Sequence, residues 1–107
     1  MSTLTILVVD DETDVQHLFP VLFRRQIRKK QYRFLFAASG QEALDMLGQY
    51  PGIDLMLCDI DMPGMSGLEL LETLQTQGME LPVIMVSAHR DKTYVQAAME
   101  AGAYDYV

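Results

Sequence analysis

Short apolar runs alternate along the chain with segments whose apolar residues lie three and four positions apart. The first run, Leu4–Val9, is rich in β-branched residues and shows no regular polar alternation, which is typical of a strand buried on both faces of a parallel sheet. Strands that alternate with helices in this way predict an α/β fold with helices on both faces of a parallel sheet. The expected strands span residues 4–9, 32–37, 54–58, 82–86 and 103–107.

Helix starts are marked after the first three runs. A Ser or Thr with Glu or Gln three residues later forms a capping box, in which each residue bonds a backbone N–H of the first turn. Three such pairs occur: Thr13 with Gln16, Ser39 with Glu42, and Ser66 with Glu69. We therefore expect helices to begin at these three places.

Helix interruptions and ends are marked as well. Pro20 lacks a backbone N–H, so it should kink the first helix or shift its start. Gly48, Gly78 and Gly102 stand where the second, third and fourth helices should end, because glycine readily adopts the conformation that closes a helix. The fourth helix is expected from about residue 91 to 101.

Length and charge indicate one soluble globular domain over residues 1–107. The net charge of −7 argues against direct nucleic-acid binding, since a phosphate backbone requires a basic face. Cys58 is the only cysteine, so no intrachain disulfide is expected. Because we find neither a signal peptide nor the ~20 apolar residues needed to cross a bilayer, we expect no membrane contact and a cytoplasmic location.

The positive charge is concentrated in one segment. Six of the eight basic residues lie within ten positions: Arg24, Arg25, Arg28, Lys29, Lys30 and Arg33. The simplest interpretation is a solvated helix end, where basic side chains interact favourably with the helix dipole. A docking role toward an acidic partner or an output domain is the alternative.

The carboxyl ends of three expected strands carry polar side chains. Asp10 and Asp11 follow the first strand, Asp59 follows the third, and Ser87 follows the fourth. Ligands bind at this edge of open α/β sheets. Carboxylates gathered there raise one another's pKa unless a cation neutralises them. Mg²⁺, which prefers oxygen ligands, is the expected ion, and it indicates phosphoryl transfer.

Four motifs at these positions together resemble the receiver domain of two-component signalling. They are Val8-Val9-Asp10-Asp11-Glu12, the DIDMPGMSG segment at 59–67, Val86-Ser87-Ala88, and the AGAYDY segment at 101–106. The resemblance covers the whole chain, in order and at the family's spacing. It implies a CheY-like (flavodoxin-like) doubly wound fold with a five-stranded parallel sheet. It also implies a signalling module that takes its phosphoryl group from a sensor histidine kinase or a phosphotransfer protein.

The resemblance implies a role for each acid at the strand ends. Asp59 matches the phosphoacceptor, whose carboxylate attacks phosphorus to form an acyl phosphate. Asp11 matches a direct Mg²⁺ ligand and Asp10 a second acid that helps to hold the ion. Asp59 and the backbone carbonyl of Asp61 match the other protein ligands. The module is then no enzyme beyond self-phosphorylation from small donors and self-dephosphorylation.

The resemblance also implies a switch. Ser87 matches the hydroxyl that hydrogen-bonds a phosphoryl oxygen, and Tyr106 matches the aromatic residue that changes rotamer as the hydroxyl moves. Together they would convert a local charge change into a shift of a two-state element.

One departure from the family concerns a lysine. Receivers carry it a few residues beyond the aromatic of the last strand, before a proline and a further helix. This sequence stops at Val107, and none of Lys29, Lys30 and Lys92 lies at that position. We therefore expect a domain cut from a longer protein, without its last helix and with an unknown downstream output domain. The uncovered sheet side would invite association, so a homodimer is among the expected partners.

Two other functions stay open on the sequence alone. A pseudo-receiver would keep the fold as a protein-interaction module without phosphotransfer; the absent lysine favours it, and the intact acids count against it. Asp59-Ile60-Asp61 also resembles the D-x-D nucleophile motif of haloacid-dehalogenase-type phosphatases. In that family, however, the motif ends the first strand rather than the third.

Overall fold

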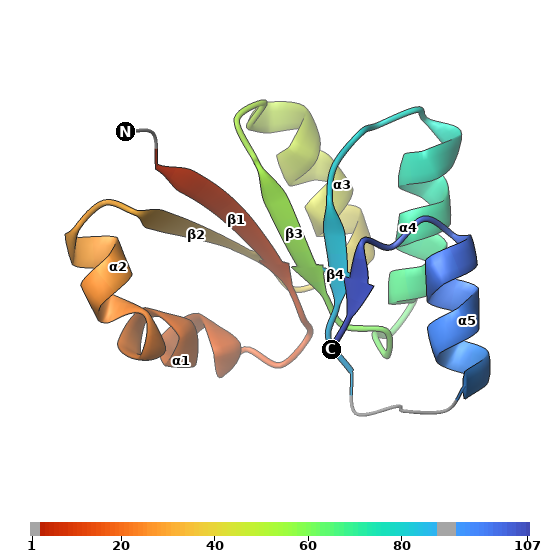
Figure 1. The fold of residues 1–107 in the computed structure, drawn as a ribbon, viewed down its shortest axis with the longest axis horizontal. Coiled ribbons are helices and arrows are strands. Elements are labelled where there is room, and N and C mark those ends of the chain that lie inside the picture. The colour runs from red at the N-terminus through yellow and green to blue at the C-terminus, as the bar shows by residue number, and fades with distance from the viewer. Residues whose placement is uncertain (1–2, 88–91) are drawn as a thin grey trace.

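A computed structural model describes residues 3–87 and 92–107, so the predictions that fall on Ala88 and Asp91 lie outside the described residues. One five-stranded sheet forms the centre, with all strands parallel and in the order β2-β1-β3-β4-β5 (Figure 1). The strands are β1 (Leu4–Val9), β2 (Tyr32–Ala37), β3 (Leu55–Cys58), β4 (Val83–Met85) and β5 (Asp105–Tyr106). The predicted doubly wound fold is confirmed; β1 and β2 have the predicted bounds, and the other strands are shorter.

Helices cover both faces of this sheet (Figure 1). On one face lie α1 (Val15–Leu22) and α2 (Arg24–Arg28), against β2. On the other lie α3 (Gly40–Gln49), α4 (Gly67–Thr76) and α5 (Lys92–Glu100). The two faces differ in how completely they bury the strands.

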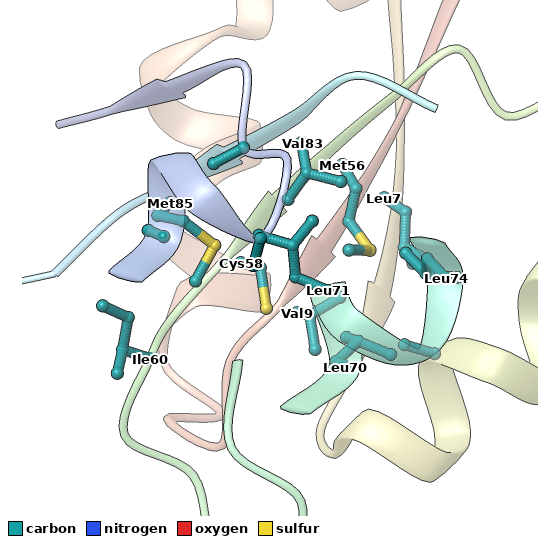
Figure 2. Packing of buried hydrophobic residues seen from close by; sticks show 14 of the residues in the cluster. Leu7, Val9, Met56, Cys58, Ile60, Leu70, Leu71, Leu74, Val83 and Met85 are labelled. Carbon is teal, nitrogen blue, oxygen red and sulfur yellow. The ribbon is translucent and has the colours of Figure 1, made fainter. Parts of the chain in front are cut away.

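The face under α3, α4 and α5 holds the main apolar core. Strand residues that point to it, such as Leu7, Met56 and Met85, are fully buried (Figure 2). Leu70 and Leu74 of α4 close over them. Truncating side chains of this kind to alanine typically costs about 2–5 kcal/mol, so this face supplies much of the stability.

The opposite face packs aromatic rings. Phe19 of α1 meets Phe34 of β2 edge to face, with ring centroids 5.6 Å apart, and Phe23 lies 5.4 Å from the same ring. Such pairs contribute about 0.5–1.5 kcal/mol beyond their buried area. In β3, however, Leu55 and Leu57 on this face are only half buried, whereas their neighbours on the other face are buried.

The first predicted capping box is wrong. The N-cap of α1 is Asp14, which has helical backbone angles and makes no side-chain capping bond. The chain enters the helix through a turn, in which the N–H groups of Val15 and Gln16 donate to the carbonyls of Glu12 and Thr13. Because backbone carbonyls already satisfy these donors, the Thr13 hydroxyl has no capping function.

Pro20 does not shift the start of α1, and the helix is interrupted after it. Phe23, with φ −111° and ψ 24°, separates α1 from α2. A proline inside a helix removes one backbone bond and crowds the preceding turn. This effect falls on the turn before Pro20, so it does not account for the break at Phe23. The continuous helix expected through residue 27 is two short helices in the structure.

The other helix signals are largely confirmed. Ser66 and Glu69 form a complete capping box, and Ser39 accepts from the backbone N–H of Glu42. The Glu42 carboxylate bonds the N–H of Ala38 instead of completing its own box. Gly78 and Gly102 follow α4 and α5 with φ of 71° and 100°.

The helix end predicted at Gly48 is wrong. The third helix, α3, continues through Gln49, and the N–H of the C-cap residue Tyr50 donates to the carbonyl of Met46. Glycine in a helix costs only about 1 kcal/mol relative to alanine. The packing of Leu44 and Leu47 against the core holds the last turn despite this cost.

Candidate functional site

The register of the sheet aligns three strand ends. Val9 of β1 pairs with Cys58 of β3, and Cys58 pairs with Met85 of β4. The ladder continues one step further, since the N–H of Asp59 donates to the carbonyl of Val9 at 3.0 Å. The residues that follow these strands are therefore held at one edge by backbone hydrogen bonds.

Three carboxylates meet at this edge. One carboxylate oxygen from each of Asp10, Asp11 and Asp59 lies within 4.8 Å of the others. Asp10 is further fixed because its Oδ1 accepts the N–H of Glu12 at 2.9 Å. Within residues 3–87 and 92–107, no Lys or Arg side chain pairs with the three acids. The predicted grouping of these acids is thus observed, and their oxygens could hold a hard divalent cation.

The pKa of Asp59 is raised above its usual value. Burial is the main cause, because it disfavours the charged carboxylate, and the negative charge of Asp10 adds to it. Backbone hydrogen bonds from Asp61 and Ile60 act in the opposite direction, and the charge of Asp61 raises the pKa slightly. The carboxylate is therefore held by backbone donors in a position where a second negative charge is costly.

Asp61 is exposed and lies two residues beyond Asp59. Its backbone N–H supports the Asp59 carboxylate, and the charge of its side chain raises the pKa of Asp59. The side chain is not part of the three-carboxylate cluster. This agrees with a role through the backbone, although a carbonyl ligand at Asp61 stays a prediction.

Ser87 and Tyr106 lie on neighbouring strands. Ser87 is 9% exposed and follows β4, while Tyr106 of β5 pairs with Met85 and packs against the core. The N–H of Ser87 donates to the carbonyl of Val107, and the N–H of Val107 donates to Met85. Ser87 is two residues beyond Met85, so its side chain lies on the same sheet face as Tyr106.

Gly67 supports the site and was not singled out from the sequence. A Cβ at Gly67 would collide with the backbone carbonyl of Asp59 and would crowd Met85 and Ile60. The N–H of Gly67 donates to the carbonyl of Ile60 at 2.9 Å. The start of α4 therefore packs directly against the turn after β3. The sequence signal for this contact was a glycine at the first position of the helix, directly after the N-cap residue Ser66. Because the capping box already accounted for the helix start, this glycine was given no separate role.

Cys58 lies directly behind the cluster. Its thiol is buried and donates to the carbonyl of Asp59 at 3.3 Å. Burial, together with the charges of Asp59 and Asp10, raises the pKa of the Cys58 thiol to about 12. The thiol is thus held in its neutral form, as is typical of a buried packing cysteine with little reactivity.

Comparison with known proteins identifies the family. A family model described as the response regulator receiver domain matches residues 6–107, which include every strand end of the acidic site. The chain belongs to the response regulator receiver domains. Such a domain is in general not an enzyme. Asp59-Ile60-Asp61 lies within the matched residues, which belong to a receiver domain rather than to a haloacid-dehalogenase-type phosphatase.

Relatives and solved structures agree with this family. A two-component response regulator of Arabidopsis thaliana, ARR10, is 38% identical over 95% of this chain. A probable cyclic di-GMP phosphodiesterase of Vibrio cholerae is 39% identical over 100% of the chain. The chain spans only 18% and 23% of these two proteins, so the second name describes a much longer molecule.

The receiver domain of the Francisella response regulator 1452 has a similar structure, with a TM-score of 0.85 and 26% identity. The similarity covers 98% of this chain and 83% of that one. No helix within the described residues is long and apolar enough to cross a membrane.

Proposed function

We propose that this receiver domain accepts a phosphoryl group on Asp59 from a phosphohistidine of a histidine kinase or phosphotransfer protein. The observation that carries the proposal is the meeting of the Asp10, Asp11 and Asp59 carboxylates at the edge of the sheet. Residues 1–107 would form the receiver part of a longer regulator whose output domain follows. The family assignment supports this function, and the acidic site supplies the chemistry.

The acids also fit Mg²⁺. Three carboxylates whose oxygens lie within 4.8 Å, with no basic side chain paired to them in the described residues, form an oxygen-rich site that lacks a counter-charge. Mg²⁺ binds with one or two carboxylates, several waters and phosphate oxygens. We assign Asp11, Asp10, Asp59 and the carbonyl of Asp61 as its protein ligands. When bound, the ion would neutralise charge on the carboxylates and the incoming phosphoryl group.

In the proposed transfer, one Asp59 carboxylate oxygen attacks the phosphorus in line with the imidazole nitrogen of the donor. The new P–O bond forms an acyl phosphate as the P–N bond breaks, and the nitrogen keeps the electron pair of that bond. The backbone donors at Ile60 and Asp61 hold the carboxylate for this attack. Water would later release the phosphoryl group and restore the carboxylate.

We further assign Ser87 and Tyr106 as the readout. The Ser87 hydroxyl would donate to a phosphoryl oxygen on Asp59, and Tyr106 would change rotamer as Ser87 moves. Support comes from their position on one sheet face at adjoining strand ends. With Ser87→Ala, phosphoryl uptake should persist while the change in the Tyr106 ring signals is lost.

The test is incubation with Mg²⁺ and acetyl phosphate, followed by intact mass measurement and hydroxylamine treatment. We expect one added phosphoryl group that hydroxylamine removes, as an acyl phosphate requires. Asp59→Asn should abolish the addition completely. Asp61→Asn is the matched control, because it also removes one carboxylate nearby but leaves the proposed acceptor; it should still be modified.

Beryllofluoride separates the phosphoacceptor from the pseudo-receiver. As a phosphoryl mimic it should shift the amide NMR signals of residues 10, 11, 59 and 87 only when Mg²⁺ and Asp59 are both present. Mg²⁺ shifts without any beryllofluoride or acetyl phosphate response would refute the acceptor function for this chain. That result would favour an interaction module with the same fold.

A further inference from the structure

The positively charged segment has no role in the proposed phosphotransfer. No acidic residue occurs between Asp14 and Glu42, and this interval holds six of the eight basic residues of the chain. The structure places Arg24, Arg25 and Arg28 on α2, Lys29 and Lys30 at its end, and Arg33 on β2. None of the six forms an ion pair with any described residue. Their charges are therefore directed to solvent.

An apolar groove lies next to this charge, between α2 and β2. Its volume is about 480 Å³, and most of its lining is aliphatic or aromatic. Ile27 of α2, Pro20 of α1, and Tyr32, Phe34 and Phe36 of β2 form the floor. Lys30 and Arg33 also line it, at the side of the basic segment. An apolar floor beside a row of cations suits a ligand with both an apolar anchor and negative charge.

The position of the groove separates it from the acidic site. The groove lies along β2, which is an edge strand of the sheet. Figure 1 shows α2 beside the start of β2, on the side away from β5. The carboxylates follow the opposite, carboxyl ends of β1 and β3. A ligand in the groove would therefore leave Asp59 accessible to a phosphoryl donor.

We propose that this basic aromatic groove (Pro20, Ile27, Lys30, Tyr32, Arg33, Phe34 and Phe36) docks a short acidic segment of a partner protein. One large apolar side chain of the segment enters the groove, and its carboxylates face the basic residues. The inference goes beyond phosphoryl acceptance, since it needs neither Asp59 nor Mg²⁺. It assigns a second binding surface to the domain.

Charge outside the segment selects against a long polyanion. The rest of the chain carries all fifteen acids and only two basic residues. A nucleic acid or an anionic membrane extending past the groove would meet this negative surface, which repels it. A short segment confined to α2 and β2 meets only the cations. The apolar floor adds an affinity that a bare phosphate chain would not use.

The test is an amide NMR titration with a synthetic peptide of aspartate and glutamate residues around one central phenylalanine. We expect saturable shifts at residues 27, 30, 32 and 34, with a Kd below about 1 mM. Replacing the peptide's phenylalanine by serine should weaken binding at least tenfold, because serine buries no aromatic ring against the apolar floor. Beryllofluoride shifts near Asp59 should persist with the peptide bound.

Matched variants test the charge. Lys30→Gln should weaken binding about two- to fivefold, as expected for one exposed ion pair. Lys92→Gln also removes one exposed positive charge, but at α5, and should leave binding unchanged. Equal effects of both variants, no saturable shifts, or undiminished binding of the serine peptide would overturn the proposal. Tighter binding of single-stranded DNA or of anionic vesicles at the same residues would overturn it as well.

Discussion

The acidic edge and the basic groove concentrate opposite charges in different ways. At the edge, three short carboxylate side chains stand on strand ends fixed by the hydrogen-bond ladder, with their oxygens within 4.8 Å. In the basic segment, long Lys and Arg side chains extend from α2 and the edge strand into solvent. The edge keeps like charges close together, and the basic segment lets them spread apart.

This difference indicates what each region can bind. Burial and the negative charge of Asp10 raise the pKa of Asp59, and the clustered carboxylates create a site that a small, hard cation can neutralise. A flexible Lys or Arg side chain at a solvated surface contributes little binding free energy through a single ion pair. Binding to the basic segment therefore requires an apolar contact beside the cations. The edge is thus prepared for an ion and a phosphoryl group, and the groove for a larger partner.

The largest contrast should be in thiol reactivity. Burial, together with the charges of Asp59 and Asp10, raises the pKa of Cys58 to about 12, so at pH 8 only about one thiol in 10⁴ is ionised. Gln31→Cys would place an exposed thiol among the cations, with an ordinary pKa of about 8.5 or lower. We expect iodoacetamide to modify the introduced thiol at least about 10³ times faster.

Peptide mapping by mass spectrometry at early times gives the two rates. Denatured protein is the control, because both thiols should then react alike. Similar rates in the native protein would show that the acids and burial do not protect Cys58.

The next effect is on cation affinity. Asp11→Asn removes one negative charge from the cluster. The attraction between two opposite unit charges 4 Å apart is about 1 kcal/mol in water and about 4 kcal/mol near a protein surface. Mg²⁺ affinity, measured by amide NMR titration, should therefore fall by about tenfold or more.

Asp14→Asn is the control, since Asp14 is exposed, lies three residues further on and makes no side-chain capping bond. It should change the affinity little. If both variants weakened binding equally, net charge rather than the cluster would control the ion.

Sequence reasoning recovered the acidic edge because each of its parts has a local signal. Asp10, Asp59 and Ser87 directly follow buried apolar runs, and parallel strands bring such ends together. The packing of Gly67 against Asp59 was missed, because it depends on how α4 returns to the sheet. The groove was also missed as a shape. Its charge is visible in the sequence, but its floor requires the break at Phe23 that places α2 beside β2.

A smaller effect concerns the cost of the acidic edge to stability. The folded-state pKa of Asp59 is raised, so the ionised carboxylate destabilises the fold at neutral pH, and this cost is relieved as the pH falls through that pKa. Asp59→Asn removes the charge and should stabilise the metal-free protein at pH 7 by at most about 1 kcal/mol, because solvent screens this partly exposed carboxylate. That corresponds to at most roughly 4–8 °C in Tm for a domain of this size.

Thermal unfolding followed by circular dichroism at several pH values provides the measurement. The difference in Tm between Asp59→Asn and the parent should shrink toward low pH, where Asp59 is protonated. Added Mg²⁺ should shrink it too, by stabilising the parent. A variant less stable than the parent at pH 7 would mean that the backbone donors outweigh burial and repulsion.

The smallest expected effect is in the basic segment, and it comes from backbone strain at one residue rather than from charge repulsion. Lys30 has φ 57°, because it closes α2: its N–H donates to Ile27 and the N–H of Gln31 donates to Gln26. This pair of bonds is the Schellman motif, whose left-handed position favours glycine. Lys30→Gly relieves about 1–2 kcal/mol of backbone strain and loses about 0.5–1 kcal/mol of chain entropy, for a net gain of about 0.5–1 kcal/mol.

Lys29→Gly is the control, because it removes the same charge at a residue with φ −81°; urea unfolding should therefore show no gain in stability for this variant. Equal stabilisation by both variants would show that repulsion among the cations, rather than the turn, limits stability here, and the contrast with the acidic edge would be lost.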